Sequence, residues 1–333
     1  MRGIRRVIGG GCTLALLLLG LVVAGPAQAA NVSCGQVITQ STTLNGNVGP
    51  CQVGIRIGAD NIVLNLNGFT VSGTAGQGEE GGIVVLNRSG VTIRNGTVTG
   101  FDTGVYVESS TRTMITGMNV TGNVGQGIFD EGIQLYLSDR NTIFNNDVTE
   151  NGHGAGIALY DSSYNTIDRN RVENNNIRGI DHTHGSQQNI GIRVFFLGDR
   201  LAPTTGNVVS NNLVRNNGLD GIQFSRFTQG NTAKGNTVLN NGLTGGSIRD
   251  GDGIAVFGRQ NFVQDNEVRN NGQSGIHVYV GGTGNYIQRN VAFGNNAGPN
   301  PDAQFDLRDD NPSCDATLWM GNQFGTRNQS CIN

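Results

Sequence analysis

The sequence has little proline, little tryptophan and no excess of basic residues. Of 333 residues, 6 are proline and 1 is tryptophan, whereas 53 are glycine. Because glycine follows no strict period and proline is scarce, a collagen triple helix is excluded. Acidic residues outnumber basic ones by 25 to 22, which argues against a nucleic-acid-binding surface. The composition is instead typical of a turn-rich repeat protein.

The first residues have the three parts of a secretory signal peptide. Three arginines lie within the first six residues, an apolar run covers 14–25, and Ala27-Gln28-Ala29 is a small-residue cleavage site. The apolar run is too short for a stable membrane span. We expect residues 1–29 to be removed and the chain to be secreted, periplasmic or on the exterior of the cell envelope. The mature chain then has 19 basic and 25 acidic residues, a net charge of −6.

The cysteines agree with export to an oxidising compartment. Cys12 belongs to the signal peptide, and the other four are Cys34, Cys51, Cys314 and Cys331. Four cysteines allow three connectivities, but these form two close pairs at opposite ends of the chain. We therefore predict the disulfides Cys34 to Cys51 and Cys314 to Cys331, one near each end.

A five-residue asparagine spacing predicts short strands. In "NTIDRNRVENN", Asn165, Asn170 and Asn175 are separated by units whose apolar residues are Ile167 and Val172. In a helix, residues five apart are rotated by about 140° and share no face. A short strand with one inward apolar residue fits, closed by an asparagine that tolerates left-handed backbone.

This pattern and a second one repeat through the chain. Further copies of the five-residue asparagine pattern begin at Asn141, Asn207, Asn231, Asn261 and Asn285. Between them a glycine opens an alternating strand such as "GIQL" or "GIAV", and these glycines are Gly54, Gly82, Gly104, Gly132, Gly156, Gly191, Gly221, Gly253 and Gly275. Units this small must stack to bury their apolar residues.

The repeats predict an all-β fold, a single-stranded right-handed parallel β-helix. We expect about ten coils of three short strands, with disulfide-stapled ends. The expected organisation is a cap at 30–53, the β-helix at 54–302 and a second cap at 303–333.

Three features are typical of a known family: the repeated asparagines, the segment "GVTIRNGTVTGFDTGVYV" (90–107) and the segment "SCGQVITQSTTLNGNVGPC" (33–51). In these features the chain resembles the pectate-lyase-like superfamily of β-helix repeat proteins. That superfamily includes uronan lyases, mannuronan epimerases and the nitrous-oxide-reductase maturation β-helix protein. The resemblance implies a uronic-acid-containing polysaccharide as partner. It does not select one activity.

Two outward positions of the glycine-led strands form a predicted substrate surface. One column contains Tyr136, Tyr160 and Phe195, whose exposed rings would stack on sugars. Hydrogen-bonding residues beside it complete the predicted substrate-binding set, Gln134, Gln223 and Arg178. Alternatively, the rings stiffen the sheet or pack under a loop.

A loop before one of these strands contains the predicted catalytic residues. Proton abstraction beside a uronate carboxylate needs a base, a cation and a second proton-transfer group. Asp181, His182, His184 and Arg193 supply these groups. The segment "GIDHTHG" is similar to the Asp-Pro-His motif of mannuronan epimerases but lacks the proline. Alternatively, these are polar residues of a long turn.

Loop residues also suggest a metal site, with Asp130, Glu131 and His153 as candidate ligands and calcium as the candidate cofactor.

The hypothesis is a monomeric secreted protein that binds an acidic polysaccharide and modifies it by lyase or C5-epimerase chemistry. The alternatives are a non-catalytic envelope or surface protein, or a metal-handling periplasmic β-helix protein. Whether the chain is an enzyme stays open.

Overall fold

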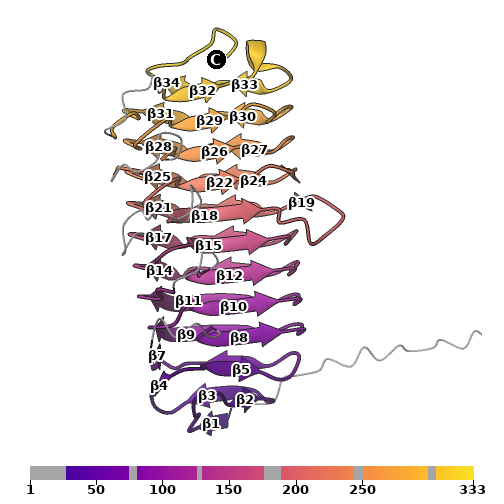
Figure 1. Ribbon diagram of the computed structural model, residues 1–333, viewed down its shortest axis with the longest axis vertical. Coiled ribbons are helices and arrows are strands. Elements are labelled where there is room, and N and C mark those ends of the chain that lie inside the picture. Colours follow the sequence, from indigo (N-terminus) through magenta and orange to yellow (C-terminus); the bar gives the residue numbers. More distant parts are fainter. Residues whose placement is uncertain (1–27, 75–80, 126–129, 176–188, 244–250, 299–304) are drawn as a thin grey trace, which may run out of the picture.

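The chain winds into a long rod of stacked coils (Figure 1). The computed structural model describes residues 28–74, 81–125, 130–175, 189–243, 251–298 and 305–333. In a typical coil, one strand is followed by two shorter ones, and each strand pairs in parallel with its counterparts in the next coils. The predicted right-handed parallel β-helix is confirmed.

The strands form three stacks along the rod, listed here in their order of pairing. Stack one contains β1 (Gln28–Ala30), β3 (Thr42–Leu44), β6 (Val63–Asn65), β9 (Thr92–Thr99), β11 (Met114–Thr121), β13 (Thr142–Phe144), β16 (Thr166–Asp168), β20 (Val208–Ser210), β24 (Thr232–Lys234), β27 (Phe262–Gln264), β30 (Tyr286–Gln288) and β33 (Leu318–Met320). Stack two contains β4 (Val48–Cys51), β7 (Thr70–Gly73), the long strands β9 and β11 again, β14 (Asp147–Thr149), β17 (Arg171–Glu173), β21 (Leu213–Arg215), β25 (Thr237–Leu239), β28 (Glu267–Arg269), β31 (Val291–Phe293) and β34 (Gln323–Phe324).

The third stack is an eleven-stranded sheet made by the glycine-led strands. It contains β2 (Val37–Ile38), β5 (Ile55–Ile57), β8 (Ile83–Leu86), β10 (Val105–Glu108), β12 (Ile133–Tyr136), β15 (Ala155–Tyr160), β18 (Ile190–Phe195), β22 (Ile222–Phe224), β26 (Ile254–Val256), β29 (Ile276–Val278) and β32 (Leu307–Asp309). A two-stranded ribbon, β19 (Thr204–Thr205) with β23 (Thr228–Gln229), lies at one edge, and a 3-10 helix covers Pro312–Cys314.

Alternate residues of each strand fill the interior. Ile157 and Leu159 of β15 are fully buried and lie in register with equally buried residues of β12 and β18. The glycine that begins the strand is required by close packing. A β-carbon at Gly156 would lie 2.6 Å from Val172 Cγ1 and 2.7 Å from Asn175 Nδ2. The glycine-led pattern therefore marks the point where the chain enters a crowded corner.

Buried asparagines form three ladders along the rod. Asn170 shows the pattern: its backbone N–H and its Nδ2 both donate to Asn212 Oδ1, at 2.8 and 3.0 Å, and Nδ2 also donates to the Ile143 carbonyl at 2.9 Å. The ladders comprise Asn141, Asn165, Asn207, Asn231, Asn261 and Asn285; Asn146, Asn170, Asn212, Asn236, Asn266, Asn290 and Asn322; and Asn123, Asn151, Asn175, Asn217, Asn241, Asn271 and Asn295. The amides, all buried except the partly exposed Asn295 and Asn322, are thus satisfied by hydrogen bonds.

The predicted left-handed backbone occurs, but not at the ladder asparagines. It occurs one residue earlier, at Asn145 (φ 53°), Arg169 (φ 55°) and Asn211 (φ 54°), while the ladder residues that follow them have no positive φ. The expectation that the ladder asparagine is the left-handed residue was therefore wrong. The turn is made by the preceding residue, and the asparagine side chain bonds across to the next coil.

Both ends are closed by covalent and polar contacts. The predicted disulfides are present, with Cα atoms 5.4 Å apart for Cys34 and Cys51 and 6.0 Å apart for Cys314 and Cys331. At the C-terminal end, Asp306 ends the third ladder. Its Oδ1 accepts from the N–H and Nδ2 of Asn295, at 3.1 and 2.9 Å, and its Oδ2 accepts two backbone N–H groups of the last coil.

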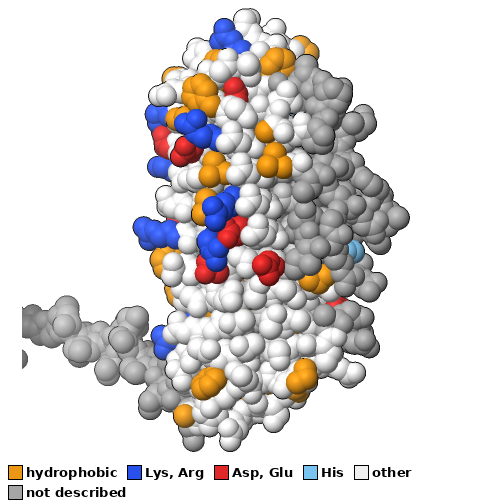
Figure 2. Space-filling model, turned by 90° about the vertical axis from the view of Figure 1, so that its left-hand side faces the viewer, with side chains coloured by type: hydrophobic (Ala, Val, Ile, Leu, Met, Phe, Trp, Pro, Cys, Tyr) orange, Lys and Arg blue, Asp and Glu red, His pale blue; other side chains and the backbone are white. Residues whose placement is uncertain are grey.

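The face formed by stack two has a surface of mixed charge. Figure 2 shows acidic and basic side chains interspersed on this side of the rod. Arg171 Nε lies 2.8 Å from Asp147 Oδ1, and Glu173 pairs with both Arg171 and Arg215. Because these charges neutralise one another, the face attracts neither polyanions nor polycations strongly. Within the described ranges, no helix has the length and apolar character needed to cross a bilayer.

The ladders should contribute a large part of the stability. Replacing Asn212 by Ala removes the acceptor of two Asn170 donors in the interior, and we expect a loss of about 2–4 kcal/mol of unfolding free energy. Chemical denaturation measures this loss. The control is Asn119→Ala, because Asn119 is exposed on β11 and should change stability by less than about 0.5 kcal/mol. Equal effects of the two changes would contradict a stabilising ladder.

Candidate functional site

The outer face of the eleven-stranded sheet aligns the predicted substrate-binding residues. Tyr136 lies opposite Tyr160, and Tyr160 lies opposite Phe195. The neighbouring outward column is, in order, Gln134, Ala158, Arg193, Gln223, Ala255 and His277. The side-chain directions therefore follow the alternation expected from the sequence.

The expected exposure of these residues was wrong for most of them. Tyr160 is 0% exposed, Arg193 1%, and Gln134 and Gln223 less than 9%; only Tyr136 and Phe195 are partly exposed. Tyr160 belongs to a second apolar cluster, outside the interior of the rod, made with Ala155, Ala158, Ile190 and Leu219. This packing covers the outer face, so Tyr160 cannot be an open platform for a sugar.

Glu131, Tyr160 and Arg193 meet in this covered region and form the Glu131 cluster. Glu131 directly precedes Gly132 and is fully buried. The Tyr160 hydroxyl donates to Glu131 Oε1 at 2.5 Å, and Arg193 Nη1 lies 3.4 Å from the Tyr160 hydroxyl. The Arg193 guanidinium also lies 3.9 Å from the centre of the Phe195 ring. Three successive strands thus bring an acid, a phenol and a cation together.

Backbone packing keeps the Glu131 carboxyl in place. A β-carbon at Gly154 would lie only 2.7 Å from Glu131 Oε1. The Gly154 N–H donates to the Asp130 carbonyl at 3.1 Å, which holds this turn against the segment before β12. A side chain at position 154 would therefore displace the carboxyl.

Burial raises the pKa of Glu131 to about 8, although the Tyr160 hydrogen bond and the charge of Arg193 both act to lower it. Burial and the neighbouring Glu131 also raise the pKa of Tyr160 well above its ordinary value. At neutral pH the carboxyl is therefore mostly protonated. A carboxylic acid with a pKa near neutrality can both give and take a proton, as general acid–base catalysis requires.

The other predicted site residues have different outcomes. Asp181, His182, His184 and Arg178 lie outside the described residues, so their predicted roles stay predictions. Asp130, Glu131 and His153 stay predicted metal ligands. Among the described residues no three His, Cys, Asp or Glu side chains form a group that could hold a metal ion. Glu131 bonds to Tyr160 as a buried neutral acid.

A second buried polar cluster was not predicted as a site. Asp252 Oδ2 accepts from the Tyr279 hydroxyl and lies 2.9 Å from His277 Nδ1, while His277 Nε2 lies 3.0 Å from Asp310 Oδ2. Arg308 Nε donates to Asp310 Oδ1 at 2.8 Å. A carboxylate oxygen beside each ring nitrogen favours the doubly protonated form of His277.

The sequence does contain a signal for these buried acids. Glu131, Asp220 and Asp252 each directly precede a glycine-led strand, in "EGIQL", "DGIQF" and "DGIAV", and each is fully buried. Asp220 is satisfied by the N–H groups of Gly251 and Asp252 and by Gln223 Nε2. An acid at this position therefore marks a buried carboxyl.

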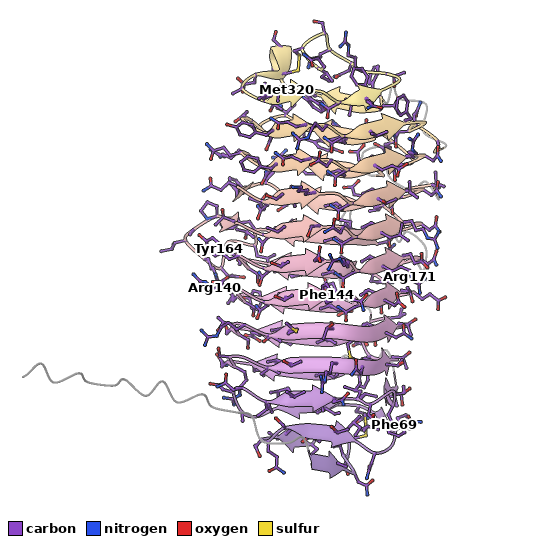
Figure 3. All side chains as sticks on the ribbon, turned by 180° about the vertical axis from the view of Figure 1, so that it is seen from behind. Phe69, Arg140, Phe144, Tyr164, Arg171 and Met320 are labelled. Atoms are coloured by element: carbon purple, nitrogen blue, oxygen red, sulfur yellow. A yellow bond between two sulfur atoms is a disulfide. The ribbon has the colours of Figure 1, made fainter. Side chains whose placement is uncertain are left out.

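A shallow groove of about 600 Å³ lies on another face, between stacks one and two. Glycines such as Gly96 and Gly117 form its floor, and Arg169 and Arg171 border it. Figure 3 shows Arg171 at this side of the rod. Arg171 is already paired with Asp147 and Glu173. The groove thus lacks an unsatisfied charge or an acid–base pair.

Comparisons with known proteins agree with the fold. Residues 30–195 match the family described as periplasmic copper-binding protein (NosD), and residues 200–292 match the right-handed beta helix region. A comparison with curated proteins gave no match.

Three solved structures illustrate the range of similar proteins. The Dettilon tailspike protein has a TM-score of 0.60 at 16% identity, over 88% of this chain and 61% of the tailspike, so the chain spans less than two thirds of that protein. The periplasmic alginate epimerase AlgG gives 0.55 at 14% identity, over 88% and 76% of the two chains. An alginate lyase from Paenibacillus sp. str. FPU-7 gives 0.51 at 17% identity, over 93% and 94%.

At such identities the likeness concerns the fold alone. Together with the coil geometry, it identifies the fold of the chain as a right-handed parallel β-helix. Its first half is, in addition, similar to the NosD family.

Glu131 should make stability fall as pH rises. Its folded pKa of about 8 lies above its unfolded value, so the folded state binds the extra proton and loses stability between about pH 5 and pH 8, by up to about 1.4 kcal/mol per pH unit. Glu131→Gln removes this dependence. Denaturation at several pH values compares it with wild type and with Glu150→Gln, an exposed control. Parallel curves for Glu131→Gln and wild type would contradict a neutral buried acid.

His277 should affect the stability of the fold in a different pH range from Glu131. Burial opposes its charge, but Asp252 and Asp310 outweigh burial and raise its pKa above the ordinary value. Its contribution is therefore complete below about pH 6.5 and is lost as pH rises through the folded pKa. We expect His277→Gln to lower the melting temperature more at pH 6 than at pH 9. A difference that grows toward high pH would show that His277 is neutral in the folded protein.

Proposed function

We propose that this chain is an exported protein that binds a uronic-acid-containing polysaccharide on the outer face of the eleven-stranded sheet and transfers a proton to or from it. The observation that carries this proposal is the Glu131 cluster, a buried carboxylic acid with a pKa near 8 beside a phenol and a guanidinium. The two predicted disulfides and the NosD match support export to the periplasm or beyond.

The cluster has the chemical groups that lyase or epimerase chemistry needs. Removing the proton beside a uronate carboxylate requires a nearby positive charge to offset the developing negative charge, and Arg193 has that charge. The Tyr160 hydroxyl donates a short hydrogen bond to Glu131, which orients the carboxyl. The alginate epimerase and alginate lyase that share this fold support a substrate of this class.

Access is a constraint on this mechanism. Glu131 and Tyr160 have no exposed surface, whereas Tyr136 and Phe195 do. A sugar therefore meets Tyr136 and Phe195 first and reaches the acid only when the packing over Tyr160 opens. The value of kcat/KM should change near pH 8, because it reports the free enzyme, in which burial raises the pKa of Glu131 to about 8.

The test is an assay of the mature protein with alginate, pectate and glycosaminoglycans, with calcium supplied. Absorbance detects unsaturated uronates, and NMR detects epimerisation. We expect Glu131→Gln to lower turnover by about 100-fold or more while binding is kept, because the amide cannot exchange the proton. The exposed acid Glu150 is the matched control, and Glu150→Gln should behave as wild type.

Two results would overturn parts of the proposal. Turnover that survives in Glu131→Gln removes Glu131 from the chemistry. If the protein binds these substrates but turns over none of them, the non-catalytic glycan-binding function is the one that remains. In that case Tyr136→Ala should still weaken binding, by about 1–2 kcal/mol, if the partly exposed ring contacts the glycan.

Copper handling is the second candidate, and the NosD match over residues 30–195 favours it. The described residues do not fit a copper site. They contain no group of three suitable ligands, and their four cysteines are in disulfides. Any such site would need residues outside the described ranges, such as His182 and His184. Copper titration of wild type and of a His182→Ala, His184→Ala double variant decides whether this candidate survives.

A further inference from the structure

A loop between β18 and β20 projects from the side of the rod, at the position of β19 in Figure 1. Its residues 197–203 are called the projecting loop here. The connection from β18 to β20 is longer than the corresponding connections in the neighbouring coils, from β15 to β16 and from β22 to β24.

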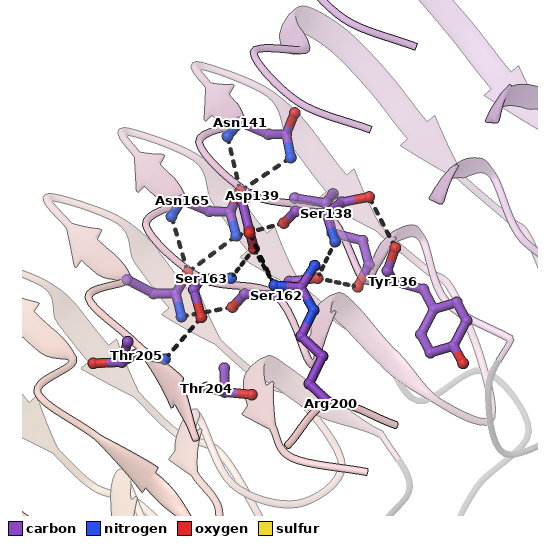
Figure 4. Close-up of polar contacts among 12 residues, drawn as sticks. Tyr136, Ser138, Asp139, Asn141, Ser162, Ser163, Asn165, Arg200, Thr204 and Thr205 are labelled. Atoms are coloured by element: carbon purple, nitrogen blue, oxygen red, sulfur yellow. Dashed lines mark hydrogen bonds and ion pairs between the residues drawn. The ribbon is translucent and has the colours of Figure 1, made fainter. Parts of the chain in front are cut away.

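All charged residues of the projecting loop are bound to the rod. Asp161 accepts the N–H of Leu197 at 3.0 Å and that of Asp199 at 2.8 Å. Arg200 Nη1 contacts both carboxylate oxygens of Asp139 at 2.8 Å, as Figure 4 shows, and the Tyr136 hydroxyl donates to Asp199 Oδ2 at 2.9 Å. These contacts give the loop a fixed conformation.

The apolar residues of the loop point into solvent. Leu201 is 109% exposed and Leu197 38%, and Ala202 and Pro203 are also exposed. Beside the loop, the Phe227 ring is 61% exposed and lies 5.7 Å from the Phe196 ring. Surface loops usually show the opposite arrangement, with charges outward. A fixed loop that exposes leucine indicates a contact surface.

Exposed arginines lie along the same edge. Arg226 directly precedes Phe227, and Arg259 pairs across from Gln229 of β23. Arg140 stacks over the Tyr164 ring at 5.3 Å, and Figure 3 shows this pair at the edge of the rod. The nearby Asp139 is already neutralised by Arg200. Asp161 and Asp199 bond to backbone N–H groups and to the Tyr136 hydroxyl, so four arginines and three aspartates leave this edge one positive charge in a chain that is acidic overall.

We propose that the projecting loop docks the protein on an anionic lipid bilayer. Leu197 and Leu201 enter the interfacial region, and Arg140, Arg226 and Arg259 contact the headgroups. A narrow convex tip cannot bury the roughly 1,000 Å² that a stable protein interface needs, whereas a bilayer accepts a protruding apolar tip without a complementary pocket. The loop contacts the proposed glycan surface through the Tyr136–Asp199 hydrogen bond, but docking itself requires no turnover at Glu131.

The experiment measures cosedimentation with vesicles of phosphatidylcholine, with and without phosphatidylglycerol. We expect binding that requires phosphatidylglycerol and weakens with salt. The Leu197→Ser, Leu201→Ser double variant should bind at least about tenfold more weakly, since both apolar side chains are lost. Leu243→Ser is the matched control, because Leu243 is similarly exposed, at 40%, on a different connection. An Arg140→Gln, Arg226→Gln variant should lose the preference for phosphatidylglycerol.

A second measurement reports insertion directly. Trp319, the natural tryptophan, is only 3% exposed, so the emission of a Leu201→Trp variant should shift to the blue when vesicles are added, while wild-type emission stays constant. Circular dichroism confirms that each variant is folded. Absence of binding to either vesicle type overturns the proposal. So does concentration-dependent self-association that Leu201→Ser abolishes, because the loop would then contact a second copy of the chain.

Discussion

The structure depends on one interaction, the hydrogen bonds between asparagine amides of successive coils. An inner ladder amide accepts twice and donates from its side chain in the buried interior, as Asn170 and Asn212 illustrate. An unsatisfied amide there would be costly. The coil corners therefore have to repeat closely, while the connections between them are free to vary. That division explains why the candidate sites lie on outer faces and loops and not in the interior.

Much of the fold could be predicted because this constraint is local in sequence. The five-residue spacing gave the two short strands of each coil, and the glycine-led pattern gave the third. The left-handed residue was misplaced by one position because the amide bonds and the turn are made by neighbouring residues. Residues as different as Arg169 and Asn211 adopt the left-handed conformation, so composition alone does not locate it.

The candidate site was less predictable. Strand alternation gave the direction of Tyr160, but its burial depends on Ile190 and Leu219, which come from later parts of the chain. Likewise, Glu131 was recognised as a loop acid, whereas its raised pKa arises from burial beneath that packing. The sequence also has an acid directly before the glycine-led strand at Asp220 and Asp252. Only the structure shows that a side chain at this position is buried.

The end of the third ladder determines more than the closing of the rod. Within a ladder, each inner asparagine accepts bonds from the asparagine of the coil before it and donates to that of the coil after it, so the array has a direction. Asp306 receives both bonds from Asn295 but its carboxylate cannot pass one on, and it serves as a terminator. Because the coils of the ladders meet through the same asparagine contacts, one such coil can be duplicated or deleted by evolution and the contacts on either side still match. Rod length is then a heritable variable separate from the stability of any one coil.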